Sequence, residues 1–247
     1  MKRKTKRNKA VTLKDKRILI IGILLVGLLM IGVLITIMVQ PPVNHFTIGN
    51  GNKLKGIDVS NHQGEIDWHI LPHDKVNYVF IKATEGTTFN DLYFKNNWEK
   101  ASEYNFLKGA YHFFTVGASG AEQAKSFIAQ VPKEKNVLPP VIDLELLGND
   151  REAVIEEVRI FVDKLEDHYG VKPIFYVNKT TFQTYVEGVF DDYLLWYADY
   201  APEPALDPSL WTFWQYTESG QVEGIRGNVD FNIFNGSKSD LEKIIVP

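Results

Sequence analysis

Short apolar runs, each about the length of one β-strand, recur along the larger, carboxyl-terminal part of this chain. They are rich in Val, Ile, Tyr, Phe and Trp and read as continuous hydrophobic stretches instead of a clean apolar and polar alternation. Continuous runs are typical of strands in a sheet whose two faces are both covered. Eight such strands are expected, at residues 54–59, 78–83, 109–114, 140–144, 173–177, 194–198, 212–216 and 229–233.

Helical patterns lie between several of these runs. They cover residues 91–104, a stretch that begins at Ser119 with a Ser-x-x-Glu capping box ending at Glu122, and residues 150–169, where Gly170 is the expected stop. Strands that alternate with helices predict a parallel sheet, and eight strands favour a closed barrel. The connections after residues 198 and 216 are too short for helical crossovers. We therefore expect an α/β fold, an irregular TIM-like (β/α) barrel with eight strands and fewer than eight helices.

The first 39 residues differ in character from the rest of the chain. Residues 1–17 contain nine Lys and Arg and one Asp, whereas residues 18–39 contain no charged residue. As a helix, the uncharged stretch is about 33 Å long, which matches the hydrocarbon core of a bilayer. A cleaved signal peptide is the alternative, but its apolar region is usually about 7–15 residues long and ends in a small-x-small site, which residues 35–42 lack.

This pattern predicts four segments: a basic cytoplasmic tail at 1–17, a transmembrane helix at 18–39, a linker at 40–53 and one folded domain at 54–247. Basic residues stay on the cytoplasmic side, so a single-pass protein of the cell membrane with an extracellular domain is expected. Residues 40–247 contain 18 Lys and Arg against 30 Asp and Glu. Such an acidic domain argues against nucleic-acid binding. The chain has no cysteine, which excludes disulfides and thiolate metal sites.

Four acidic residues close or interrupt apolar runs, at the place where barrels of this kind carry their functional side chains. They are Asp58, Asp143, Glu145 and Asp230. Since side chains alternate along a strand, Asp143 and Glu145 are expected to point the same way. Two carboxyl groups that face one cavity repel each other, which raises the pKa of one of them.

Such a pair suits the cleavage of glycosidic bonds, in which one acid protonates the leaving oxygen and a second negative group supports the cationic transition state. The alternative is that each acid caps a turn or pairs with a Lys or Arg. Rival chemistries lack their motifs: the sequence contains no Gly-x-Ser-x-Gly elbow, phosphate-binding glycine loop or His-Glu-x-x-His metal site. No cofactor or metal is expected. His112 lies within an apolar run and is interpreted as a hydrogen-bonded core or rim residue.

Seven motifs together resemble family 25 of the glycoside hydrolases, which are lysozymes that cut the β-1,4 bond after N-acetylmuramic acid in peptidoglycan. The motifs follow the family's order through most of the domain at 54–247, which identifies it as a catalytic domain like those of this family. They are KGIDVSNHQG at 55–64, FIKATEG at 80–86, GAYHFF at 109–114, PVIDLE at 140–145, FYVN at 175–178, LWYA at 195–198 and WQYTESGQVEGIRGNVDFN at 214–232.

The resemblance implies catalytic roles for all four acids, with Glu145 as general acid and base and with Asp143, Asp58 and Asp230 as its partners. It also implies an irregular eight-stranded barrel. Aromatic residues at positions expected near the sugar groove are Tyr111, Tyr176, Trp196 and Trp214, for which core packing is the alternative. Lys82 and Glu85 are expected to pair at the rim of the site.

The function predicted in this way is that of a membrane-anchored muramidase. It would cleave peptidoglycan glycan strands with retention, for cell-wall remodelling or lysis, and the membrane segment would keep it near its substrate. For Asp143, direct attack and support of the substrate's N-acetyl group both remain open, and the second is favoured. The alternative function is a non-catalytic peptidoglycan-binding or scaffold module of a wall-spanning assembly, since a fold alone supports many functions.

Overall fold

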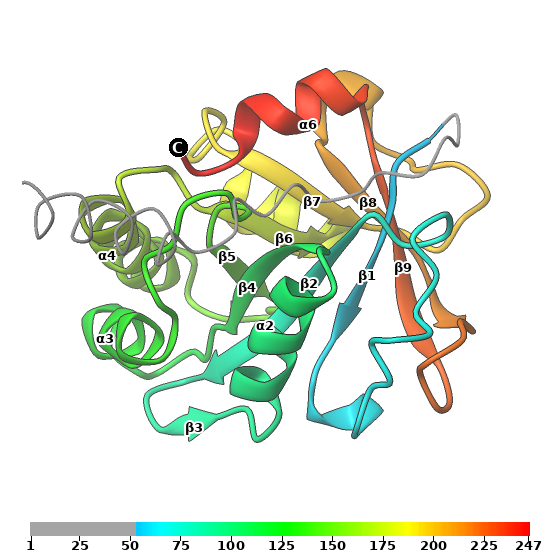
Figure 1. Cartoon of the computed structure of the whole chain (residues 1–247). Helices are drawn as coiled ribbons and strands as arrows, with labels where there is room; N and C mark the ends of the chain where they lie inside the picture. Colours follow the sequence, from blue (N-terminus) through cyan, green and yellow to red (C-terminus); the bar gives the residue numbers. More distant parts are fainter. Residues whose placement is uncertain (1–52) are drawn as a thin grey trace, which may run out of the picture. The chain divides into compact units, whose positions relative to one another are not determined.

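Each of the eight expected strands forms in the computed structural model, which describes residues 53–247, and together they close a barrel (Figure 1). Neighbouring strands pair around the ring, and β1 also pairs with β2, which closes it. The strands are β1 (Lys55–Val59), β2 (Tyr78–Glu85), β4 (Leu107–Phe113), β5 (Val141–Leu144), β6 (Ile174–Asn178), β7 (Leu194–Ala198), β8 (Phe213–Gly220) and β9 (Val229–Phe234).

The expectation of a parallel sheet holds for the seven ring strands β1, β2 and β4 to β8 and fails for β9. This last strand is antiparallel to both of its neighbours, β8 and β1. The physical reason is the length of the connection between β8 and β9, residues 221–228, which allows a hairpin but no crossover. A further strand that the sequence did not indicate, β3 (Phe89–Asn90), forms a short hairpin with the end of β2.

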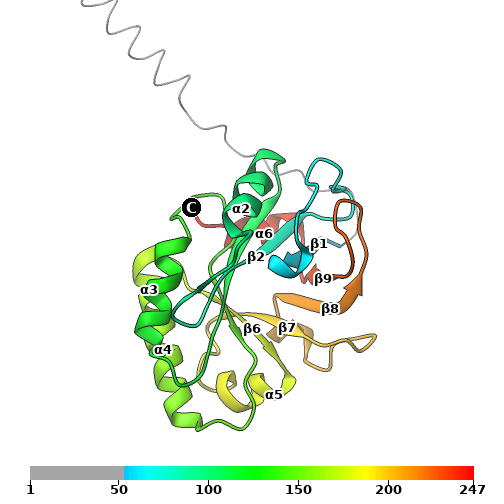
Figure 2. The same cartoon turned by 90° about the horizontal axis from the view of Figure 1, so that it is seen from below.

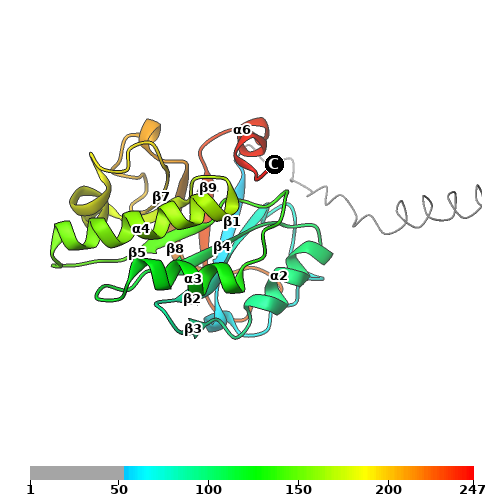
Figure 3. The same ribbon diagram turned by 90° about the vertical axis from the view of Figure 1, so that its left-hand side faces the viewer.

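Helices cover the barrel unevenly. The connection from β2 to β4 contains α2 (Phe94–Glu103), and α3 (Gly120–Gln130) and α4 (Arg151–Tyr169) follow β4 and β5. Figure 3 shows α3 and α4 side by side on the outside of the sheet. The chain after β6 forms only α5 (Lys179–Thr181) and a π-helical turn, η2 (Phe182–Val186). Short helical turns, η1 (Asn61–Gln63) and η3 (Pro208–Leu210), occupy the connections after β1 and β7, and α6 (Lys238–Ile244) follows β9.

The capping box expected at Ser119 and Glu122 does not form. The Ser119 side chain makes no capping hydrogen bond, and the Gly120 N–H instead donates to Glu157 Oε2 of α4 at 2.6 Å. A carboxylate of the neighbouring helix thus satisfies the first free amide of α3, which makes the local cap unnecessary. The ends of α4 agree with the prediction, because Asp150 caps its first turn and Gly170 ends it with φ 78°.

Two apolar clusters stabilise this architecture. One fills the barrel and contains Tyr78, Phe80, Trp196 and Phe213, with Leu241 of α6 in the same cluster. The other lies between the strands and the surrounding helices. The interior is tight, since a Cβ atom added at Gly56 would come within 2.1 Å of the Tyr78 ring. The barrel is therefore a packed core, and only its carboxyl end is available for chemistry.

The basic tail, the transmembrane helix and almost all of the linker predicted at 1–53 lie outside the described residues. Within residues 53–247, no helix is both apolar enough and long enough to cross a bilayer.

Candidate active site

The four acidic residues singled out in the sequence come together at the carboxyl end of the barrel, the end that Figure 2 views directly. Asp58 lies on β1, Asp230 on β9 and Asp143 on β5, and Glu145 follows the last residue of β5. The chain brings them together because the parallel strands β1 and β5 finish at this end of the barrel, whereas the antiparallel strand β9 begins there. The mutual effects of their charges, described below, indicate that they form one site.

Asp143 and Glu145 point toward the same side of β5, as the alternation of side chains predicts. Val141, two residues before Asp143, belongs to the cluster inside the barrel, whereas Ile142 and Leu144 belong to the outer cluster. Asp143 is only 7% exposed, and its Oδ1 atom is buried without a hydrogen-bond partner. Burial, the charge of Glu145 and that of Asp58 hold the pKa of Asp143 well above its usual range.

Glu145 has a more open position, with an exposed side chain at the mouth of the barrel. Partial desolvation raises the pKa of its carboxyl group, and the negative charges of Asp230 and Glu218 raise that pKa further. The ammonium group of Lys82 acts in the opposite direction. A carboxyl group that is accessible and has a raised pKa can keep a proton and deliver it to a ligand, which is what a general acid requires.

Asp58 and Asp230 form a second acidic pair. They are directly opposite each other in the antiparallel register of β1 and β9, and their carboxyl groups hydrogen-bond to each other. Burial and the charge of Asp230 hold the pKa of Asp58 well above its usual range. Burial also raises the pKa of Asp230, but the hydrogen bond from Asp58 lowers that pKa and so offsets part of the rise. The pKa of Asp230 is raised less than that of Asp58, so Asp58 is the member of the pair that favours the protonated form more strongly.

Two buried amides that the sequence analysis missed hold Asp58 in place. Gln215 Nε2 and Asn232 Nδ2 both donate to Asp58 Oδ2, at 3.0 and 2.8 Å. Gln215 Oε1 in turn accepts hydrogen bonds from the hydroxyls of Tyr176 and Tyr200, at 2.8 and 2.9 Å. Both amides are almost fully buried, and each has apolar neighbours on both sides in its strand. A polar residue inside an apolar run was the signal that could have revealed these amides. Asn232, for example, lies two positions beyond Asp230 and therefore points to the same side of the strand.

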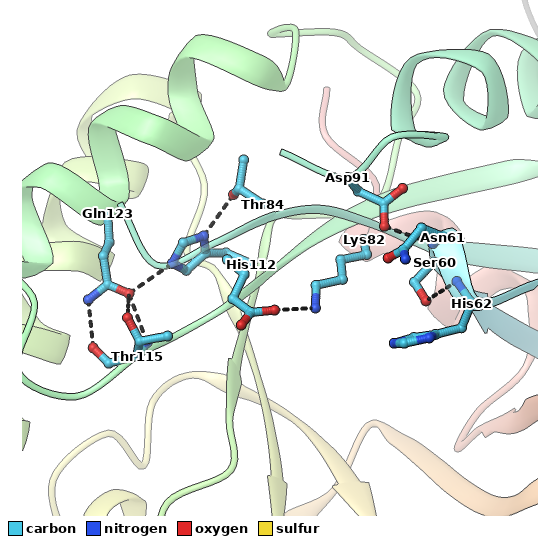
Figure 4. A network of polar contacts seen from close by, with 10 residues as sticks. Ser60, Asn61, His62, Lys82, Thr84, Asp91, His112, Thr115 and Gln123 are labelled. Atoms are coloured by element: carbon cyan, nitrogen blue, oxygen red, sulfur yellow. Dashed lines mark hydrogen bonds and ion pairs between the residues drawn. The ribbon is translucent and has the colours of Figure 1, made fainter. Parts of the chain in front are cut away.

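Lys82 and Glu85 pair at the rim, with a distance of 2.7 Å from Lys82 Nζ to Glu85 Oε2. Figure 4 shows Lys82 beside the loop after β1, where the Asn61 N–H donates to Asp91 Oδ2 at 2.8 Å. The Lys82 side chain is mostly buried and also lies over the rings of Phe89 and Phe113. Its positive charge lowers the pKa of both Asp143 and Glu145 and so offsets part of the rise that burial causes.

The four aromatic residues expected near the sugar groove separate into two groups. Tyr111 is partly exposed, and burial together with the charges of Asp58 and Asp143 raises the pKa of its hydroxyl. Tyr176 lines an open groove, described below. Trp196, in contrast, is 2% exposed and stacks on Phe80 inside the barrel.

Trp214 lies on the other face of β8 from Gln215, and its indole N–H donates to the Asp199 carbonyl at 2.6 Å. Trp196 likewise donates its indole N–H to Asn232 Oδ1, at 2.7 Å. Both tryptophans are therefore buried and hydrogen-bonded, and neither lines the groove described below. Their burial could not be read from the sequence, because aromatic residues suit cores and stacking surfaces equally well.

A groove with a volume of about 480 Å³ opens beside Glu145. It is large enough for part of a small ligand or a short oligosaccharide segment. Its walls come from the ends of β6, β7 and β8 and from the loops that follow them. The lining residues are Glu145, Tyr176, Asn178, Lys179, Thr180, Ala198, Asp199, Tyr200 and Glu218.

His112, on β4, does not take part in this acidic cluster. It is fully buried, with Nδ1 2.7 Å from Thr84 Oγ1 and Nε2 3.1 Å from Gln123 Oε1 (Figure 4). Burial lowers its pKa to about 4, so the ring is neutral at physiological pH. This agrees with the expected hydrogen-bonded core histidine.

Comparisons with protein families, known proteins and solved structures all find glycosyl hydrolases or lysozymes. Residues 57–225 match the family described as glycosyl hydrolases family 25. Lysozyme M1 of Streptomyces globisporus is 31% identical over 207 residues, which cover 76% of this chain and 70% of that protein. A solved family 25 glycosyl hydrolase from Bacillus anthracis superimposes with a TM-score of 0.73 at 36% identity, covering 81% of this chain and 97% of that one. A bacterial lysozyme from Streptomyces coelicolor gives 0.72 at 29% identity, with 79% and 98% covered.

Proposed function

Because the chain belongs to family 25 of the glycosyl hydrolases and is a glycoside hydrolase of the lysozyme type, we propose that it cleaves peptidoglycan glycan strands with retention of anomeric configuration. The bond cleaved is the β-1,4 bond between N-acetylmuramic acid and N-acetylglucosamine. The observation that carries the proposal is the pairing of an accessible Glu145 of raised pKa with a buried Asp143 that has an unpartnered oxygen.

Glu145 acts as the general acid and then as the general base. Its raised pKa favours the protonated form in mildly acidic solution, and its carboxyl group lines the groove in which the glycan would lie. The proton passes to the glycosidic oxygen as the bond to the anomeric carbon breaks. In the second half of the reaction the Glu145 carboxylate accepts a proton from the incoming water.

Asp143 orients the acetamido group of the sugar whose anomeric carbon reacts. Its buried Oδ1 has no hydrogen-bond partner within the described residues, so it can accept the acetamido N–H of a bound substrate. This contact turns the acetamido carbonyl oxygen toward the anomeric carbon, and that oxygen forms the new bond while the leaving oxygen departs. Water then opens the cyclic intermediate, and the two displacements together retain the configuration.

Asp230 supplies a negative charge to the site, and Asp58 holds the Asp230 carboxylate by a hydrogen bond. The Asp230 carboxylate contributes a negative charge close to Glu145 and to the cationic transition state. The protonated Asp58 donates a hydrogen bond to Asp230 and is itself held by Gln215 and Asn232. We assign contacts with sugar hydroxyl groups and ring surfaces to Tyr176, which lines the groove, and to Tyr111 and the Lys82–Glu85 pair at the edge of the site.

The enzyme would act on the outer side of the cell membrane, held there by residues 18–39. The support is in the sequence: a basic segment at 1–17 followed by 22 uncharged residues. Protease added to cells from which the wall has been removed is expected to digest the domain and spare an amino-terminal tag. A protected domain, or a mature chain released by cleavage near residue 40, would contradict the anchoring.

The direct test of the activity is digestion of purified peptidoglycan by the full-length protein in mild detergent, followed by identification of the new reducing ends. N-acetylmuramic acid ends are expected. N-acetylglucosamine ends would contradict the bond assignment. Binding to peptidoglycan without any new ends would favour the non-catalytic binding or scaffold module.

A further inference from the structure

A second groove lies at the same end of the barrel, beside β1 and β9 instead of β5 to β7. It has a volume of about 670 Å³ and is lined mainly by polar groups. Its walls come from the loop after β1, from Tyr93 and from the loop between β8 and β9. The lining residues are Gln63, Gly64, Glu65, Ile66, Asp67, Tyr93, Gly224 and Arg226.

The two loops that form this groove are joined to each other. The Asp67 N–H donates to the Gly224 carbonyl at 2.8 Å, and Gln63 Nε2 donates to the Asn228 carbonyl at 3.3 Å. The loop after β1 is also held by the Asn61 N–H bond to Asp91 (Figure 4). The groove is therefore a fixed feature of the fold and not a gap between two independent loops.

The groove begins close to the acidic cluster. Asp58 and Asp230 are paired in register, and Asn228, which meets Gln63 in the groove wall, is two residues from Asp230. Two residues of extended chain span about 7 Å. The part of the groove wall formed by Gln63 is therefore near the acids, and a substituent on a sugar bound there can extend toward it.

The two walls of the groove carry opposite charges. Glu65 and Asp67 come from one loop and Arg226 from the other, and all three side chains are exposed. Among residues 53–247, neither Glu65 nor Arg226 makes an ion pair, whereas the nearby Glu223 is paired with Lys75 at 3.0 Å. A ligand with both an ammonium and a carboxylate group would complement the two walls.

We propose that this groove binds the peptide branch that peptidoglycan carries on its muramic acid residues, with an amine of the peptide at Glu65 and a carboxylate at Arg226. The inference rests on the proposed function, because the glycan at the acids delivers the peptide to the groove. It adds a substrate preference: the enzyme acts faster on peptide-bearing strands than on bare glycan. Such strands are the peptidoglycan before its peptides have been removed.

The experiment compares full-length enzyme on two purified glycan substrates, one with peptide branches and one from which an amidase has removed them. We expect a higher kcat/KM for the peptide-bearing glycan, and we expect Arg226→Gln to reduce that preference about fivefold while leaving the rate on bare glycan unchanged. Arg151→Gln is the matched control. Arg151 is an exposed arginine that begins α4 outside this groove, and its replacement is expected to preserve the preference.

Blocking the peptide's own charges assigns the contacts. Acetylating the peptide amines is expected to weaken the preference in the wild type but not in Glu65→Gln, and amidating the carboxylates is expected to do so in the wild type but not in Arg226→Gln. Equal rates on both glycans, or a preference that Arg226→Gln leaves unchanged, would overturn this inference alone. If neither glycan is hydrolysed, the proposed function is overturned as well.

Discussion

Replacing Asp143 with asparagine removes a buried ionisable group while keeping its shape, and it is expected to make the protein more stable at neutral pH. In the unfolded chain an aspartate ionises with a pKa of about 3.9. In the folded protein, burial beside Glu145 and Asp58 holds the pKa of Asp143 well above that value. Between these two pKa values the native state binds one proton more than the unfolded state, so the free energy of unfolding falls as the pH rises.

The size of the effect follows from that one proton. The wild type loses about 1.4 kcal/mol per pH unit from this group, beginning near pH 4 and ending where Asp143 ionises in the folded state. The asparagine side chain cannot titrate, so the advantage of Asp143→Asn grows at the same rate and then becomes constant. For a domain of 150–250 residues, each kcal/mol corresponds to roughly 2–4 °C in Tm.

Urea unfolding of both proteins at pH 3, 4, 5, 6 and 7 measures the difference directly. Asp192→Asn is the control with the opposite sign, because the ion pair with Lys172 lowers the pKa of the exposed Asp192 and its loss brings no gain at neutral pH. Parallel pH profiles for the wild type and Asp143→Asn, or a less stable variant at pH 7, would refute the reasoning. The same substitution is expected to abolish most of the activity, since an asparagine cannot ionise to the carboxylate that accepts the acetamido N–H.

Three further changes test other parts of the structure. Gly120→Ala is expected to destabilise the protein by about 1–3 kcal/mol in thermal unfolding, because the new Cβ would lie 1.9 Å from the backbone oxygen of Glu157; an unchanged Tm would contradict this packing of α3 on α4. Asp58→Asn keeps the hydrogen-bond pattern of a protonated Asp58, so it is expected to be about 2–4 kcal/mol more stable than Asp58→Ala, which leaves two buried amide donors unpaired; equal unfolding free energies would place the proton elsewhere. Glu218→Gln removes a charge that raises the pKa of Glu145, so the alkaline limb of the pH–rate profile is expected to move to lower pH, and a shift to higher pH would exclude that coupling.

The barrel was predictable because its strands follow from local patterns. Continuous apolar runs identified all eight strands of the ring, and the short late connections identified where helices are missing. The direction of β9 was not predictable from its own residues, because a single strand carries no information about the direction of its neighbour. It depends on the short connection from β8, which permits a hairpin and excludes a crossover.

The site was predictable to the extent that charge is unusual inside an apolar strand. Asp58, Asp143 and Asp230 stand out for that reason, and the alternation rule brought Glu145 to the same side as Asp143. Gln215 and Asn232 are neutral and were overlooked, although both hold the Asp58 carboxyl group and oppose the rise of its pKa. Trp196 and Trp214 were expected near the sugar groove but are buried. The sequence could not distinguish the two positions, because a residue type suited to sugar stacking is equally suited to a core.

The central claim is that Glu145 transfers the proton in glycosidic cleavage. The most direct measurement compares kcat for the release of N-acetylmuramic acid ends from purified peptidoglycan by the wild type and by Glu145→Gln, with Glu218→Gln as a matched change in the same groove. We predict a loss of at least about 10³-fold for Glu145→Gln, with unchanged Tm and retained binding to peptidoglycan, and less than a tenfold loss for Glu218→Gln. A Glu145→Gln protein that is folded and cleaves within tenfold of the wild-type rate would contradict the account.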